Sequence, residues 1–144
     1  MDIAPEGTSI IQQDYLNWSP DKSTKYIVIG NPPFGRQSSL AKRFISKSCE
    51  YADVVAFILP RSFVKPSMNR VFPKVFHCIH TKELPKSAFL LNDKPYDVPC
   101  VFMVWQKKDV ERLDVDRSVP NGFTYRKPTE THHICVRRVG VYAG

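Results

Sequence analysis

The sequence has no long hydrophobic run and no recognisable export signal. None of its uninterrupted apolar stretches, such as 54–59, is longer than six residues, whereas a helix needs about 20 to span a bilayer. The N-terminus carries an acid, Asp2, and lacks an apolar segment of signal-peptide length. We therefore expect a cytoplasmic chain with no membrane partner.

Closely spaced cysteines are also missing. The four cysteines stand at positions 49, 78, 100 and 135, and none forms the Cys-x-x-Cys pair that zinc sites prefer. The neighbouring pair His132–His133 has no further ligand motif beside it, so we predict no metal site. An even number of cysteines permits disulfides, but a chain of 144 residues can build a core without them. We expect reduced, buried thiols.

The composition is that of one globular domain with a basic surface. Hydrophobic residues make up 42% and charged residues 24% of the chain. Lys and Arg number 21 against 14 acids, giving a net charge of +7. This balance favours a polyanionic partner without requiring one.

The hydrophobic pattern predicts an α/β fold. Residues 26–29 form a short apolar run typical of a strand buried on both faces, and residues 54–59 form another. Between them a helical stripe of apolar residues begins after Ser38, a suitable N-cap. A further strand is predicted over 9–16, and segments 88–91 and 98–105 are predicted to pair as an antiparallel hairpin.

The sharpest motif is Asn31-Pro32-Pro33-Phe34, which directly follows the first buried run. Ligands of open α/β sheets bind beyond the carboxyl ends of the strands. The Asn31 amide oxygen and the Pro32 carbonyl could both accept hydrogen bonds from one amino group, while Pro33 stiffens the loop. Phe34 could stack on a planar base. This combination suits an exocyclic amine that must act as a nucleophile.

The motif resembles that of the S-adenosylmethionine-dependent amino methyltransferases, most closely the N6-adenine DNA methyltransferases. The resemblance implies a Rossmann-like methyltransferase sheet of three layers, with a reversed last strand near residues 98–105. It implies that Asn31 and Pro32 hold the amine of a flipped adenine and that Phe34 stacks on it. It also implies that Asp14 binds the cofactor's adenine, that Asp2 binds its ribose and that Asn31 also borders the cofactor.

The resemblance covers residues 1–105, which we interpret as a partial catalytic core, followed by a C-terminal extension over 106–144. Family members have a first strand and a Gly-rich loop before the ribose-binding acid, whereas no Gly-x-Gly occurs here. We therefore expect an N-terminally truncated fold. A missing N-terminal segment or a second chain would complete the cofactor site.

Basic residues around the motif are candidates for phosphate contacts, although each could also be an ordinary solvated charge. They are Arg36, Arg61, Lys65 and Arg70. The expected activity is methyl transfer to the N6 amine of adenine in DNA. The alternatives are an amino methyltransferase acting on RNA or on protein glutamine, and a non-catalytic module that binds nucleic acid or scaffolds a partner.

Overall fold

The computed structural model describes residues 1–21, 23–113 and 120–135. The chain divides into two compact units, Met1–Asp114 and Val115–Gly144. The described part of the second unit, 120–135, contains no helix or strand. The first unit holds all of the regular structure described below.

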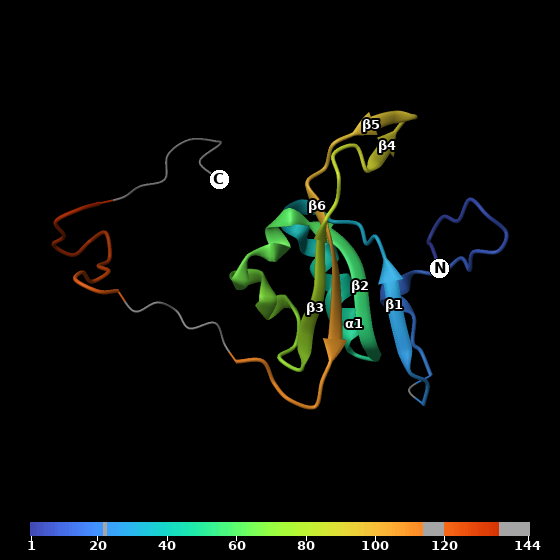
Figure 1. The fold of residues 1–144 in the computed structure, drawn as a ribbon, viewed down its shortest axis with the longest axis horizontal. Coiled ribbons are helices and arrows are strands. Elements are labelled where there is room, and N and C mark those ends of the chain that lie inside the picture. The colour runs from blue at the N-terminus through green and yellow to red at the C-terminus, as the bar shows by residue number, and fades with distance from the viewer. Residues whose placement is uncertain (22, 114–119, 136–144) are drawn as a thin grey trace. The chain divides into compact units, whose positions relative to one another are not determined.

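Four strands form the main sheet of the first unit (Figure 1). They are β1 (Tyr26–Gly30), β2 (Ala52–Pro60), β3 (Phe76–Glu83) and β6 (Cys100–Lys107), in the spatial order β1-β2-β6-β3. Strands β1 and β2 are parallel, while β6 runs antiparallel to both of its neighbours. The expected reversed last strand is therefore present. As a result, β1, β2 and β3 all end at the same end of the sheet, which we name the carboxyl rim.

One face of the sheet is covered by helical structure. Helix α1 (Ser39–Cys49) buries Ala41, Ile45 and Ser48 against it, as its apolar stripe predicted. After β2, the chain forms two short 3-10 helices, η3 (Arg61–Val64) and η4 (Pro66–Val71), which extend this cover. The core between the layers is rich in large side chains, including Phe63, Phe72 and Trp105.

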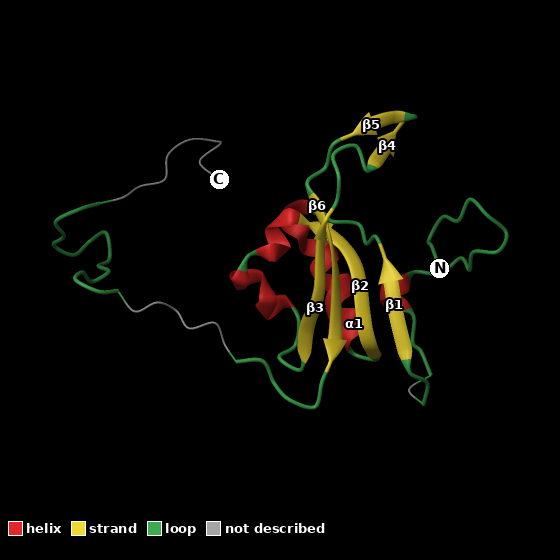
Figure 2. Ribbon diagram, in the orientation of Figure 1, coloured by secondary structure: helices red, strands yellow, loops and turns green. Residues whose placement is uncertain are grey.

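The opposite face of the sheet is open in the part of the chain that the structure describes. Ile27 and Ile29 of β1 are 68% and 72% exposed, and Figure 2 shows the helices on the other side. The expectation that residues 26–29 are buried on both faces is therefore wrong, because no described layer covers this side of β1. The expectation of a three-layer sheet is wrong for the described residues, because only one layer of helices is present among them. The coarser expectation, a mixed α/β fold, is confirmed.

The strands of the predicted hairpin pair differently from the expectation. Strand β4 (Phe89–Leu91) pairs with β5 (Lys94–Tyr96) as a separate two-stranded sheet, while β6 joins the main sheet instead. Asn92 and Asp93 have φ of 50° and 59°, the conformation of a type I′ turn that joins two strands through only two residues. This tight turn makes β5 the pairing partner of β4.

No described helix is long and apolar enough to cross a membrane.

Candidate functional site

The Asn31–Gly35 loop lies at the carboxyl rim, directly after the last residue of β1. Asn31 and Pro33 are exposed, whereas Pro32 between them is buried. The buried proline holds the corner against the protein, and the Asn31 side chain remains accessible to a ligand. The loop thus has the position that the sequence motif predicted.

The end of the loop is fixed by helix α1. The Phe34 carbonyl accepts hydrogen bonds from the backbone N–H groups of Leu40 and Ala41, at 3.2 and 3.3 Å. Gly35 has φ +68°, and a Cβ at this position would lie 2.9 Å from Cγ of Leu40. Only glycine avoids both the steric clash and the left-handed strain. Ser38 precedes α1, as expected, but its side chain makes no capping bond, because the Phe34 carbonyl serves that role.

Phe34 is less available than its predicted stacking role requires. The ring is partly buried and packs against the hydrophobic core. The core therefore fixes its orientation, and only its exposed part could contact a base. Its stacking role stays a prediction.

The two candidate acids lie on segments that run in parallel. Asp2 and Gln12 form an isolated parallel bridge. The Asp2 N–H donates to the Ile11 carbonyl at 3.0 Å, and the Gln13 N–H donates to the Asp2 carbonyl at 2.8 Å. The strand predicted over 9–16 is reduced to this bridge, because the chain turns at Asp14 into the 3-10 helix η1 (Tyr15–Asn17).

Both carboxylates already make local hydrogen bonds. Asp14 caps η1, since it accepts from the Leu16 N–H at 2.9 Å and from the Asn17 side chain at 2.7 Å. Asp2 accepts from the Ala4 N–H at 2.8 Å. A carboxylate offers about four acceptor positions, so each acid has capacity beyond these bonds.

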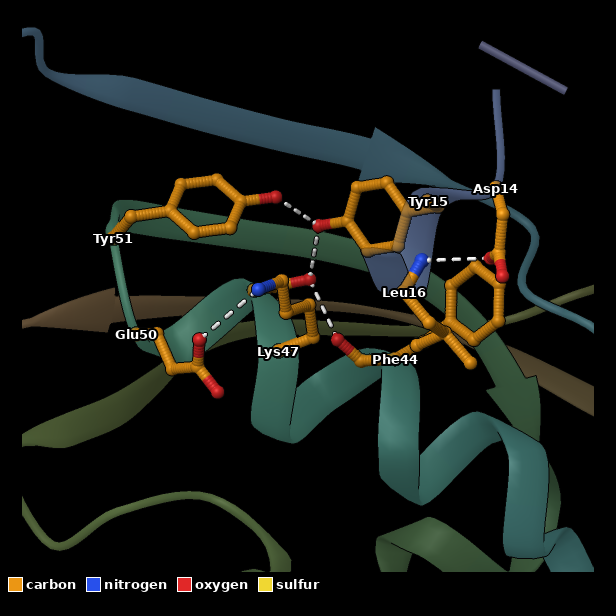
Figure 3. A network of polar contacts seen from close by, with 8 residues as sticks. Asp14, Tyr15, Leu16, Phe44, Lys47, Glu50 and Tyr51 are labelled. Atoms are coloured by element: carbon orange, nitrogen blue, oxygen red, sulfur yellow. Dashed lines mark hydrogen bonds and ion pairs between the residues drawn. The ribbon is translucent and has the colours of Figure 1, made fainter. Parts of the chain in front are cut away.

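A chain of hydroxyl groups holds the Asp14 segment on helix α1 (Figure 3). Ser48 Oγ donates to the Phe44 carbonyl at 2.7 Å and lies 2.7 Å from the Tyr15 hydroxyl, which in turn bonds the Tyr51 hydroxyl. Each hydroxyl has one proton. With the Ser48 proton committed, Tyr15 donates to Ser48 and Tyr51 donates to Tyr15.

Aromatic contacts reinforce this attachment. The Tyr15 ring stacks on Phe44 with centroids 5.1 Å apart, and Trp18, Tyr26 and Tyr51 make edge-to-face contacts with one another. Burial raises the pKa of Tyr51, and its hydrogen bond to Tyr15 acts in the same direction. The Tyr51 hydroxyl therefore stays a proton donor near neutral pH. This network positions Asp14 relative to α1, whose N-terminus also fixes the Asn31–Gly35 loop.

Two of the four predicted phosphate contacts lie at the carboxyl rim. Arg61 and Lys65 follow β2 and, with Ser62, Val64 and Glu83, line a pocket of about 440 Å³. An Arg61 nitrogen lies 3.1 Å from a Glu83 oxygen, and both side chains are more than 60% exposed. Such an exposed ion pair is weak. An incoming phosphate group could displace Glu83 from Arg61.

The other two candidates are placed differently from each other. Arg36 is exposed and belongs to the short turn (Arg36–Ser38) that follows the Asn31–Gly35 loop. Arg70 lies in η4, whose N-cap is Lys65. The carbonyl of its neighbour Asn69 accepts from Arg112, which also donates to the carbonyl of Phe76, the first residue of β3. The C-terminal part of η4 is therefore linked to the start of β3.

The charged residues of the first unit are distributed unevenly along the sequence, which the overall composition does not reveal. No acid occurs between Asp21 and Glu50 or between Asp53 and Glu83. These two stretches contain eleven basic residues: Lys22, Lys25, Arg36, Lys42, Arg43, Lys47, Arg61, Lys65, Arg70, Lys74 and Lys82. Positive charge is thus concentrated on the part of the sequence that forms the candidate site.

Within the described residues, no group of three or more His, Cys, Asp or Glu side chains could hold a metal ion.

Comparison with known proteins gives a partial likeness to a solved structure. No protein-family model matches the sequence, and no curated protein matches it. A protein from Pyrococcus horikoshii, described as a candidate RNA methyltransferase, is similar in structure, with 25% sequence identity and a TM-score of 0.45. The alignment covers 65% of this chain and 48% of that protein. The chain thus spans about half the length of the protein it matches.

Proposed function

We propose that this chain takes part in methyl transfer from S-adenosylmethionine to the N6 amine of adenine in nucleic acid, with DNA as the first candidate. The observation that carries the proposal is the exposed Asn31 amide on a proline-stiffened corner at the carboxyl rim. The sheet order supports it, because a reversed strand lies between β2 and β3, as the family resemblance implies.

The acids of the site fit the adenosine part of the cofactor. Asp14 and Asp2 carry carboxylate acceptors, which suit an amino group and ribose hydroxyls. Their segments are neighbours, and the hydroxyl network attaches Asp14 to α1. No Gly-x-Gly occurs in this sequence, so a loop approaching the methionine part is not identified. We propose that these residues supply only part of the cofactor pocket, which a second chain or a further segment completes.

The chain's own residues act on the target amine. The Asn31 side-chain oxygen and the Pro32 carbonyl accept hydrogen bonds from its two N–H groups, which draws the nitrogen toward tetrahedral geometry and exposes its lone pair. The bound cofactor supplies an electrophilic methyl group. Holding the amine in line for attack is the main contribution of the protein, and the stiff Pro32–Pro33 corner keeps that orientation.

A nucleic-acid substrate is favoured over a protein glutamine by the two acid-free basic stretches. A protein that neutralises phosphates loses affinity as salt rises, with a slope of about −0.9 per phosphate contact for duplex DNA. Binding of a protein substrate through a glutamine side chain does not require that affinity falls with salt in this way. Salt-dependent binding of oligonucleotides therefore separates these two candidates.

Two variants test the proposal. Asn31→Ala should abolish methyl transfer to adenine-containing oligonucleotides while leaving calorimetric binding of S-adenosylmethionine unchanged, because the side chain acts on the amine. Asp14→Asn retains an oxygen that can cap η1 but loses a charge-assisted acceptor, so cofactor binding should weaken by about tenfold. Unfolding transitions of both variants provide the control for structure.

Three outcomes would contradict the proposal. Retained turnover in Asn31→Ala removes this residue from the mechanism. Cofactor affinity that Asp14→Asn leaves unchanged removes Asp14 from the pocket. If the chain binds oligonucleotides but transfers no methyl group even with a completing partner, the non-catalytic alternative stands. Parallel DNA and RNA substrates decide between the two nucleic acids.

A further inference from the structure

The β4–β5 hairpin presents two chemically different faces. Directly opposed residues of an antiparallel pair lie on the same face, and successive residues alternate. The register pairs Phe89 with Tyr96, Leu91 with Lys94, and Leu90 with Pro95. One face therefore carries two aromatic rings, a leucine and a lysine, and we name it the aromatic face. The other carries Leu90 and Pro95.

The aromatic face is accessible. Tyr96 is 52% and Leu91 is 55% exposed, Lys94 is exposed, and Phe89 is partly buried. The hairpin forms a sheet of its own rather than joining the main one. A two-stranded hairpin has no internal core that could bury such side chains. This apolar and aromatic surface therefore needs a functional explanation.

The hairpin is rooted at the carboxyl rim. The Leu84 N–H donates to the Cys100 carbonyl at 3.0 Å, and the Arg61 N–H donates to the Pro99 carbonyl at 2.9 Å. Figure 1 shows β4 and β5 extending beyond the ends of β3 and β6. Strand β1, which leads into Asn31, lies two strand spacings from β6, about 10 Å. The hairpin thus arises within a few nucleotides' reach of the candidate target site.

We propose that the aromatic face of the β4–β5 hairpin binds unpaired nucleotides beside the target adenine. This inference rests on the proposed function and deepens it by naming a single-stranded segment as the substrate class. Tyr96 stacks on a base, and Lys94 contacts a phosphate.

The charge of the hairpin favours single strands over duplex. Residues 85–98 contain Lys86 and Lys94 against Asp93 and Asp97, so they carry no net charge. A duplex presents mainly phosphates outside and hides the faces of its bases, whereas unpaired bases expose faces that aromatic side chains can stack on. The basic residues at the root, Arg61 and Lys65, supply the attraction for the backbone.

Oligonucleotide binding by the full chain tests this inference. The probe is a fluorescein-labelled adenine-containing single strand of about 12 nucleotides, prepared as DNA and as RNA, with a duplex of the same sequence for comparison. Tyr96→Ala should weaken single-strand binding by about tenfold, while Tyr96→Phe keeps the ring and should bind like the wild type. Lys94→Gln should lower the salt slope by about 0.7. Leu90→Ser, on the opposite face, is the matched control and should leave affinity unchanged.

The outcomes separate this inference from the proposed function. If the wild type binds the single strand and Tyr96→Ala binds equally well, the hairpin inference is overturned while the nucleic-acid function stands. Equal losses in Tyr96→Ala and Leu90→Ser, or an equal loss on duplex, also overturn it. If the wild type binds neither DNA nor RNA, the inference and the nucleic-acid function both fail. Thermal unfolding of each variant verifies that the chain remains folded.

Discussion

The guanidinium of Arg112 lies over the ring of Trp105, with Cζ 5.1 Å from the ring centroid. Trp105 also stacks on Phe72, with centroids 4.0 Å apart. Arg112 donates to three carbonyls at 2.9–3.2 Å and to a fourth through Nε; these belong to Asn69, Phe72, Pro73 and Phe76. This one side chain ties η4, the start of β3 and the segment after β6 together. The first compact unit therefore continues past β6, to Asp114.

Replacement of Arg112 by Ala should destabilise the first unit by about 3 kcal/mol. The change leaves several carbonyls without a charged donor, at about 1.5–3 kcal/mol for such a hydrogen bond, and removes a cation–π contact worth about 1 kcal/mol. Urea unfolding followed by tryptophan fluorescence measures the loss.

Two further variants define this prediction. Arg112→Lys keeps the charge but not the planar set of donors, so an intermediate loss is expected. Arg43→Ala on the exposed face of α1 should change the free energy of unfolding by less than about 0.5 kcal/mol. An Arg112→Ala protein as stable as Arg43→Ala would show that the carbonyl contacts contribute nothing.

Substitution of Gly35 should disturb the Asn31–Gly35 loop. Gly35→Ala places a Cβ at φ +68° and 2.9 Å from Leu40 Cγ, so a loss of about 2 kcal/mol or more is expected. Gly30→Ala, at the end of β1, is the control, since its Cβ would make an ordinary 3.7 Å contact with Phe57. Thermal unfolding compares the two. Equal stability of both variants would contradict the predicted strain.

The four thiols should differ in reactivity. All are free, and Cys100 is buried, but Cys78 and Cys135 are exposed, so the expectation of buried thiols is wrong for these two. Burial raises the pKa of Cys49 to about 12 and also raises the pKa of Cys100. At pH 8, iodoacetamide should therefore label the two exposed thiols first, because the thiolate is the nucleophile. Mass spectrometry should find all four labelled once urea is present. Native labelling of Cys49 as fast as Cys78 would contradict its burial.

The same shift predicts a pH dependence of stability. The unfolded Cys49 thiol ionises near pH 9, whereas the folded one keeps its proton to about pH 12. Its contribution to stability is therefore complete below pH 9 and is lost as pH rises toward 12. Comparison of wild type with Cys49→Ala in urea unfolding at pH 8 and pH 10 isolates this effect. A difference between the two proteins that stays constant with pH would contradict it.

Local periodicity accounts for the parts of the fold that the sequence predicted. The apolar runs of β1 and β2 and the stripe of α1 appear where their spacing indicated, although β1 keeps Ile27 and Ile29 exposed. The position of Asn31 followed as well, since a loop after a parallel strand must lie at the carboxyl end of the sheet.

The sequence by itself determined the strand–helix–strand unit, the proline-stiffened Asn31 corner and the net positive charge, because each depends on neighbouring residues. Only the tertiary structure decided which partner each strand takes, which face of the sheet is covered, and how Arg112 ties the segment after β6 to the first unit. It also reduced the 9–16 segment to a single bridge. These outcomes depend on competition among contacts between residues that lie far apart in the sequence. The spacing of residues along the sequence does not show which of these contacts is stronger.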